Sequence, residues 1–253
     1  MKKKLFLYVK ALSDFGTFMD LIVLNVVVYA ATGSAAWLAA TMAARTLGGV
    51  LSSLFSGVVA DRFNRRKIMI ASDIIRVVII LLLIPFPSPM MIIVGSFLIG
   101  ACNSFFMVSF SAEIPQIFGQ NKILEVNSLI ARLTSISLVA GFIAAGILTD
   151  WIGYELTLLI DAGTYLLSTY VLLKLKWETT PARVLPITDG MKQKITAIGS
   201  DLKEVVKYLV NVPLLLLLNI VFLVGAFAGS SHNLGIPLLA EIISLINKAS
   251  IMG

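Results

Sequence analysis

The segment from residue 57 to residue 67 decides the fold, and it reads Gly57-Val58-Val59-Ala60-Asp61-Arg62-Phe63-Asn64-Arg65-Arg66-Lys67. Uncharged runs flank it, from Thr46 to Ala60 and from Val77 to Ala112. Such runs are too apolar for water, so the charged segment must lie where two membrane helices meet solvent. Its four cations indicate the cytoplasmic side, because basic residues in short loops stay there during insertion.

The composition excludes a soluble protein. Hydrophobic residues make up 58% of the 253 residues, charged residues only 13%, and the mean hydropathy is +0.95. A water-soluble chain carries roughly 25% charged residues. We therefore expect an all-α, multi-pass protein of a bacterial inner (plasma) membrane, with the lipid bilayer as a partner. The net charge of +6 is then a signal for orientation, and no nucleic-acid partner is expected. One cysteine and one histidine leave no metal cluster, so we expect no metal and no cofactor.

Seven apolar segments approach the length of about 20 residues that a helix needs to cross a bilayer. They run approximately over Val9–Ala31, Ala36–Ala60, Ile68–Pro85, Met90–Ala112, Ser128–Leu148, Leu156–Leu173 and Val212–Pro237. The first six predict an N-terminal bundle over residues 1–176. Residues 177–211 predict a cytoplasmic linker with an amphipathic helix, and residues 212–253 a seventh helix that begins a C-terminal half.

The distribution of lysine and arginine predicts a cytoplasmic N-terminus. With that orientation, Lys2 to Lys4, the cations of residues 62–67, Lys122 and the linker cations all fall on the inner side. The expected outer turns at 32–34, 85–89 and 150–155 carry no lysine or arginine. Basic residues concentrate in cytoplasmic loops in this way.

The chain also repeats a short pattern. Gly57 to Asp61 at the end of the second expected helix is echoed by Gly146 to Asp150 at the end of the fifth. A further aspartate follows inside the next helix in both cases, Asp73 and Asp161. Because the second helix would descend and the fifth rise, two three-helix units are related by inversion, an arrangement typical of transporters. Chance recurrence of Gly-x-x-x-Asp is the alternative.

The segment at residues 57–67, placed between the second and third helices, resembles the signature loop of the major facilitator superfamily. Other segments resemble its branch of macrolide and siderophore exporters, and the resemblance extends over nearly the whole chain. These segments are Thr32-Gly33-Ser34, Ser72-Asp73-Ile74-Ile75-Arg76, Asn127-Ser128-Leu129, Asp161 to Ser168, and Asp201 to Glu204.

The resemblance implies that this loop fastens two six-helix halves together on the cytoplasmic side when the transporter faces outward, and releases them when it faces inward. By position, Gly57 would allow a close helix approach, and Asp61 would accept hydrogen bonds from a helix end or pair with a cation of the other half. Arg62, Arg65 and Arg66 would hold acidic partners. Asn64 replaces the usual glycine, and asparagine tolerates a left-handed backbone better than most residues. The alternative is that these cations only set topology and contact lipid headgroups.

Charged residues inside the expected helices should face a cavity or each other, because an ionisable group at membrane depth costs at least about 2.5–3.5 kcal/mol. Asp20 and Arg45 come close to the midplane, so we expect a pair between them, or a proton and substrate site using Asp20. A purely structural salt bridge is the alternative. Asp14 and Arg132 lie nearer the cytoplasmic ends, where gating or snorkelling is expected. Asp73 and Arg76 are three residues apart on one helix, which predicts a local pair.

Candidate cavity residues for a large apolar substrate are Asn25, Asn103 and Phe106, although aromatic residues on membrane helices also simply pack. The function expected from these features is secondary active efflux, by alternating access with proton coupling, of macrolides or other small amphipathic drugs. The alternative is a membrane remnant or half-transporter that does not transport and interacts with another chain. An intramembrane enzyme is not expected, because no catalytic constellation stands out.

The length of the chain bears on the mechanism. The superfamily folds as two six-helix halves with the substrate path between them, so one half supplies one wall. Three explanations are open for a chain that ends at Gly253: a disrupted reading frame, a deliberate fragment, or a half that pairs with another chain. We expect the first, and in each case a C-terminal half is needed to complete the pathway.

Overall fold

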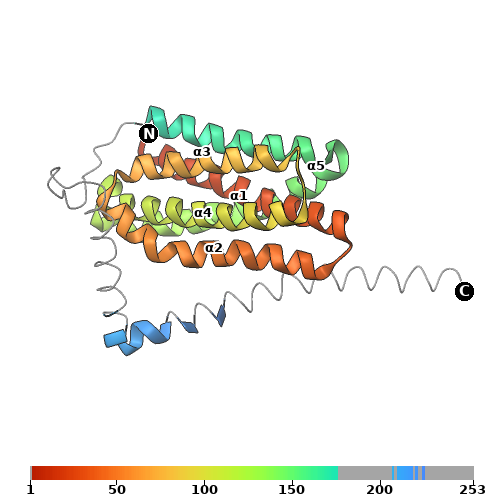
Figure 1. Cartoon of the computed structure of the whole chain (residues 1–253). Helices are drawn as coiled ribbons and strands as arrows, with labels where there is room; N and C mark the ends of the chain where they lie inside the picture. The colour runs from red at the N-terminus through yellow and green to blue at the C-terminus, as the bar shows by residue number, and fades with distance from the viewer. Residues whose placement is uncertain (1, 176–206, 208–209, 219, 222–223, 226–253) are drawn as a thin grey trace, which may run out of the picture.

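The computed structural model describes residues 2–175, 207, 210–218, 220–221 and 224–225, and these residues include no strand (Figure 1). The bundle contains α1 (Lys2–Thr32), α2 (Ala35–Arg62), α3 (Arg65–Leu83), α4 (Pro89–Phe118) and α5 (Ile123–Lys174), with a short 3-10 turn at Gln120–Lys122. The expected all-α architecture is confirmed. Most of the linker helix and part of the seventh helix that we expect lie outside the described residues.

Helix α5 contains the fifth and sixth expected spans, joined at Gly153. The backbone there has φ 82° and ψ 164°, a conformation open to glycine, and the helix axis breaks at this residue. We call residues 123–152 the first arm and residues 154–174 the second arm. Figure 1 shows the chain turning back between them.

Contacts with α1 show that the two arms run in opposite directions. Asp14 of α1 contacts Thr134, and Phe15, which follows Asp14, lies against Gly141, which is further along the first arm. Helix α1 and the first arm therefore run in the same direction. The second arm descends instead, because Thr17 meets Tyr165 whereas Leu7 shares a core cluster with Leu172. The chain therefore crosses the bundle twice within α5.

Helix ends follow local chemistry. The Ser88 hydroxyl accepts a hydrogen bond from the Met91 amide, and Pro89 occupies the first turn of α4, where its missing N–H costs nothing. Gly119, with φ 85°, ends α4. The first six expected spans lie within the helices except at one end: α3 stops at Leu83 rather than at Pro85.

Within the described residues, three helical stretches are long and apolar enough to cross a membrane: Lys4–Thr32, Pro89–Phe118 and Gln120–Lys174. Helix α2 becomes a fourth if Ala35–Ser53 and Phe55–Arg62, which are bent by 48°, are counted as one span. The third stretch contains both arms of α5. Helix α3 does not qualify on composition, because it carries the charges Arg65, Arg66, Lys67, Asp73 and Arg76. These apolar helices support a multi-pass membrane protein.

Glycines allow α2 and α4 to pack with their backbones in contact. A Cβ at Gly48 would collide with the Phe97 carbonyl, and a Cβ at Gly100 would collide with the Arg45 carbonyl. Small residues at helix contacts are the usual way to pack helices in a membrane. By contrast, a Cβ at Gly57 would meet no atom within 4 Å.

We predict that Gly100→Ala lowers the thermal stability of the purified chain in detergent, because overpacking of this kind costs typically about 1–3 kcal/mol. Gly57→Ala is the matched control and should leave stability unchanged or slightly higher. Melting followed by circular dichroism compares the two variants. Equal melting temperatures would contradict the role of Gly100 in α2–α4 packing.

Candidate functional site

A pair of opposite charges joins α1 to α2 inside the bundle. The Arg45 guanidinium lies 2.6 Å from the Asp20 carboxylate, and the exposed fractions of the two side chains are 12% and 0%. Arg45 also donates to the Thr17 carbonyl at 2.9 Å, and the Tyr165 hydroxyl donates to Asp20 at 3.1 Å. The expected Asp20–Arg45 pair is confirmed. Its role in transport is not decided by this contact.

A second pair lies within α3. Arg76 is 3.3 Å from Asp73, and both side chains are fully buried. Asp73 also accepts hydrogen bonds from Ser13 at 3.3 Å and from Ser168 at 2.6 Å, so its carboxylate joins α3 to α1 and to the second arm of α5. The expected local pair of Asp73 and Arg76 is confirmed.

Aromatic rings complete the surroundings of Arg76. Its guanidinium lies 5.3 Å from the centre of the Phe106 ring and 5.0 Å from that of the Tyr165 ring. Contacts of this kind stabilise a desolvated cation by about 2 kcal/mol. Phe106 is buried and stacks with Phe110 at 6.3 Å. In this structure Phe106 therefore packs against the charge instead of lining an open cavity.

Asp161 is a further buried carboxyl group, on the second arm of α5. Its side chain is fully buried and faces Gly16 of α1, where a Cβ would come within 2.6 Å of an Asp161 oxygen. We call Asp20, Arg45, Asp73, Arg76 and Asp161 the buried charge cluster. The sequence pattern marked Asp161 through the repeat and through the segment Asp161 to Ser168, which also contains Tyr165, but neither residue was predicted to belong to this site.

Two other candidate cavity residues are not brought into this cluster. Asn25 on α1 is 9% exposed, and its side-chain oxygen is buried without a hydrogen bond from any described residue. Asn103 on α4 is partly buried. Neither residue has a contact with the cluster among those described above, and their role as cavity residues stays a prediction.

Arg65 connects the C-terminal parts of α2 and α4. It is buried, and it donates to the Ala60 carbonyl at 3.0 Å and to the Ala112 carbonyl at 3.1 Å. It also lies 3.7 Å from Glu113 and 3.4 Å from Asp61. Arg65 thus has the acidic partners that we expected, and one of them, Glu113 of α4, was not identified from sequence. The Asp61 side chain remains 69% exposed.

Arg66 connects the loop to the end of the second arm of α5. Its guanidinium donates to the carbonyls of Leu172 at 2.8 Å and Leu173 at 2.6 Å. These carbonyls belong to the last turn of the helix, where backbone acceptors have no partner within the helix and a cation is favoured. These two bonds go to backbone carbonyls, where we expected an acidic side chain.

The backbone at Asn64 corrects one expectation. Asn64 has φ −65° and ψ 110°, an extended conformation, so the left-handed tolerance of asparagine is not used. Its side chain instead accepts a hydrogen bond from the Lys67 amide at 3.0 Å and caps the N-terminus of α3. The close helix approach expected at Gly57 is likewise not made by the described residues; Gly48 and Gly100 make it.

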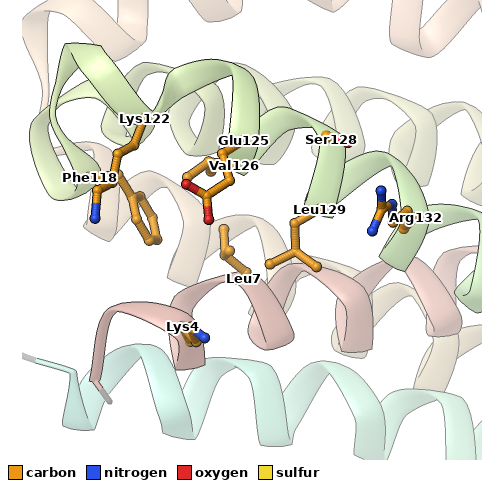
Figure 2. Close-up of a pocket in the computed structure, with 9 residues that line it drawn as sticks. All are labelled: Lys4, Leu7, Phe118, Lys122, Glu125, Val126, Ser128, Leu129 and Arg132. Atoms are coloured by element: carbon orange, nitrogen blue, oxygen red, sulfur yellow. The ribbon is translucent and has the colours of Figure 1, made fainter.

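A recess at the end of the bundle where α1 begins and α4 ends contains Arg132. It has a volume of about 320 Å³ and is lined by Lys4, Leu7, Phe118, Lys122, Glu125, Val126, Ser128, Leu129 and Arg132 (Figure 2). Asp14 lies beside Lys10 at 2.6 Å and accepts from Thr134 at 2.8 Å. Leu7 precedes Asp20 by about 20 Å of helix at 1.5 Å per residue, so this recess is separate from the buried charge cluster. Gating by Asp14 and Arg132 is not tested by this geometry.

In the part of the chain that the structure describes, no group of three or more histidine, cysteine, aspartate or glutamate residues could hold a metal ion. The sequence model of the Major Facilitator Superfamily matches residues 7–247. The chain belongs to the Major Facilitator Superfamily. Members of this superfamily are membrane transport proteins and not enzymes.

Relatives within the superfamily include proteins named "Putative bacilysin exporter BacE". The one from Bacillus subtilis (strain 168) is 29% identical over 154 residues, which cover 60% of this chain and 38% of the relative. The one from Bacillus amyloliquefaciens is 28% identical with the same coverage. The chain thus matches less than half the length of these relatives. The crystal structure of a mutant of the nucleoside transporter NupG shares the fold, with a TM-score of 0.61 and 15% identity over 82% of this chain and 51% of NupG.

We predict that Arg45→Gln destabilises this superfamily member, because Asp20 would be left buried without its cation. Breaking a buried pair by removing one partner costs about 3–5 kcal/mol. The double variant Asp20→Asn/Arg45→Gln should recover much of the loss, which a double-mutant cycle of melting temperatures measures. Full stability of the single variant would show that the pair is not needed.

Proposed function

We propose that this chain forms one six-helix wall of a secondary active exporter for small amphipathic compounds. Supporting observations are the membership of the superfamily, the matched exporter relatives and a charge cluster placed inside the bundle. A buried cluster of this kind is expensive to keep in a membrane unless it has a function. The proposal extends to drugs such as macrolides, on the segments that resemble that branch of the superfamily.

The second wall of the pathway belongs to residues beyond those described, or to another chain. Substrate paths in this superfamily run between two halves, each built from inverted three-helix repeats. We divide the chain accordingly into a bundle over residues 1–176, a linker over 177–211 and the start of a second half over 212–253.

The cytoplasmic loop, residues 57–67, is proposed to fasten the two halves. Arg65 and Arg66 hold the loop against α2, α4 and α5 through four hydrogen bonds to backbone carbonyls. Asp61 stays largely exposed on this braced loop. An exposed carboxylate in a fixed position suits a partner with a helix N-terminus or a cation, which is what the second half would supply. The observation that carries the proposal is this combination of a braced loop and an Asp61 side chain that is 69% exposed although it pairs with Arg65.

We predict that bacteria expressing this chain together with a second six-helix half accumulate less of a fluorescent amphipathic compound than control cells. Asp61→Asn should abolish the difference, because the neutral amide no longer binds the partner charge. Asp150→Asn is the matched control, since Asp150 ends the same Gly-x-x-x-Asp pattern in the other repeat. Intracellular fluorescence at steady state is the measurement. Unchanged export by Asp61→Asn would contradict the proposed role of Asp61 in fastening the two halves.

Orientation is tested by cysteine labelling. In a Cys102→Ser background, Asn64→Cys should react with an impermeant maleimide only in inside-out vesicles, because residues 57–67 are proposed to be cytoplasmic. Trp151→Cys, at a side chain that is 82% exposed, should react only in right-side-out vesicles. Labelling of Asn64→Cys from the outside would reverse the proposed topology and, with it, the cytoplasmic N-terminus.

A further inference from the structure

The buried charge cluster holds more carboxyl groups than guanidinium groups. Asp20, Asp73 and Asp161 face Arg45 and Arg76, and all but Arg45 are completely buried. With every group ionised, one negative charge would be left over. An uncompensated charge in an apolar interior is strongly unfavourable, and a carboxyl group in that position becomes neutral by taking up a proton.

Hydrogen bonds and ion pairs indicate which carboxyl group lacks compensation. Asp20 has Arg45 and Tyr165, and Asp73 has Arg76 together with the hydroxyl groups of Ser13 and Ser168. Both side-chain oxygens of Asp161 are buried and accept no hydrogen bond from any described residue. An ionised carboxylate is an acceptor that normally takes several hydrogen bonds, so this environment fits the neutral acid.

The groups around Asp161 come from four helices. Gly16, Thr17 and Asp20 lie on α1, Arg45 on α2, Asp73 and Arg76 on α3, and Thr164 and Tyr165 on α5 itself. The charged residues of this group are Asp20, Asp73, Arg45 and Arg76. The Thr164 hydroxyl donates its hydrogen bond to the Asp161 backbone carbonyl and not to the carboxyl group. The Asp20 carboxylate would repel a negative charge on Asp161, and the Arg45 guanidinium is paired with Asp20.

We propose that Asp161 is a proton-binding site, and that it holds one proton in this conformation because Arg45 contacts Asp20. Arg45 pairs with Asp20 in this conformation, so Asp161 is the carboxyl group left without a contacting guanidinium among the described residues, and it carries the proton. If Arg45 moves to Asp161, the Asp161 proton passes to Asp20, so the cluster keeps one proton and no net charge. As a coupling site this assignment rests on the proposed export function, whereas the bound proton itself does not.

The repeat supplies a contrast that sharpens the assignment. Asp73 and Asp161 occupy similar places in the two repeats, yet only Asp73 has a full set of partners. Asp161→Asn replaces a neutral acid by a neutral amide of the same shape and should leave the melting temperature unchanged. Asp73→Asn should lower it, because Arg76 loses its ion pair. A marked loss of stability in Asp161→Asn would contradict a neutral Asp161.

Infrared spectroscopy of the purified full chain at neutral pH tests the proton directly, without substrate or transport. The wild type should show the C=O stretch of a protonated carboxylic acid, which Asp161→Asn removes and the exposed control Asp150→Asn retains. Variants that keep a carboxyl group then assign the band to a residue. The frequency of the band should shift in Asp161→Glu and stay the same in Asp20→Glu.

Three results would overturn the proposal: no protonated acid in the wild type, a band that survives Asp161→Asn, or a band that moves only in Asp20→Glu. Because the measurement needs no second half, a negative export assay leaves it intact. Conversely, loss of the band has no bearing on whether the superfamily member exports a compound.

Discussion

Compensation of buried charge is the constraint on which the rest of this structure depends. A membrane bundle has no hydrophobic driving force between its helices, so specific polar contacts carry much of the information about which helices meet. Here the Asp20–Arg45 pair joins α1 to α2, and Asp73 joins α3 to α1 and α5. Each contact also leaves a costly unpaired group if it is broken, which penalises alternative arrangements.

The buried charge cluster and the loop at residues 57–67 are connected mechanically through α3. Arg65 and Arg66 begin this helix, and Asp73 and Arg76 follow on it two to three turns later. Arg66 binds the last turn of α5 while Asp73 binds Ser168 on the same arm. Because α3 and the second arm are tied at two depths, a shift that opens one contact strains the other. A change of charge in the cluster can therefore affect the loop through α3 itself, with no other connecting element.

Sequence reasoning was correct where the bilayer thickness sets the length of a span or where the helical repeat sets the spacing of two residues. Span lengths predicted the helices, the shared depth of Asp20 and Arg45 predicted their pair, and the spacing of Asp73 and Arg76 predicted theirs. It failed where the neighbour comes from a distant helix: Tyr165 meets residues of α1, and Arg66 meets backbone carbonyls at the end of α5. Spacing fixes depth and face along one helix, but it does not say which helix lies opposite. The N-cap role of Asn64 was missed because the family's usual glycine suggested a different backbone.

The outer surfaces of the bundle differ in a way that bears on what surrounds them. Beyond Lys67 in its first turn, the exposed large side chains of α3 are apolar: Ile74, Ile75, Val78, Leu81 and Leu82. Lipid suits such a face. The exposed side of the first arm of α5 instead mixes Ile136 and Val139 with Ser128, Arg132 and Ser135. Polar groups against hydrocarbon are unfavourable, whereas against a second half or a water-filled path they find partners. The first arm is therefore the side on which the proposed second wall fits, and α3 is the side that faces lipid.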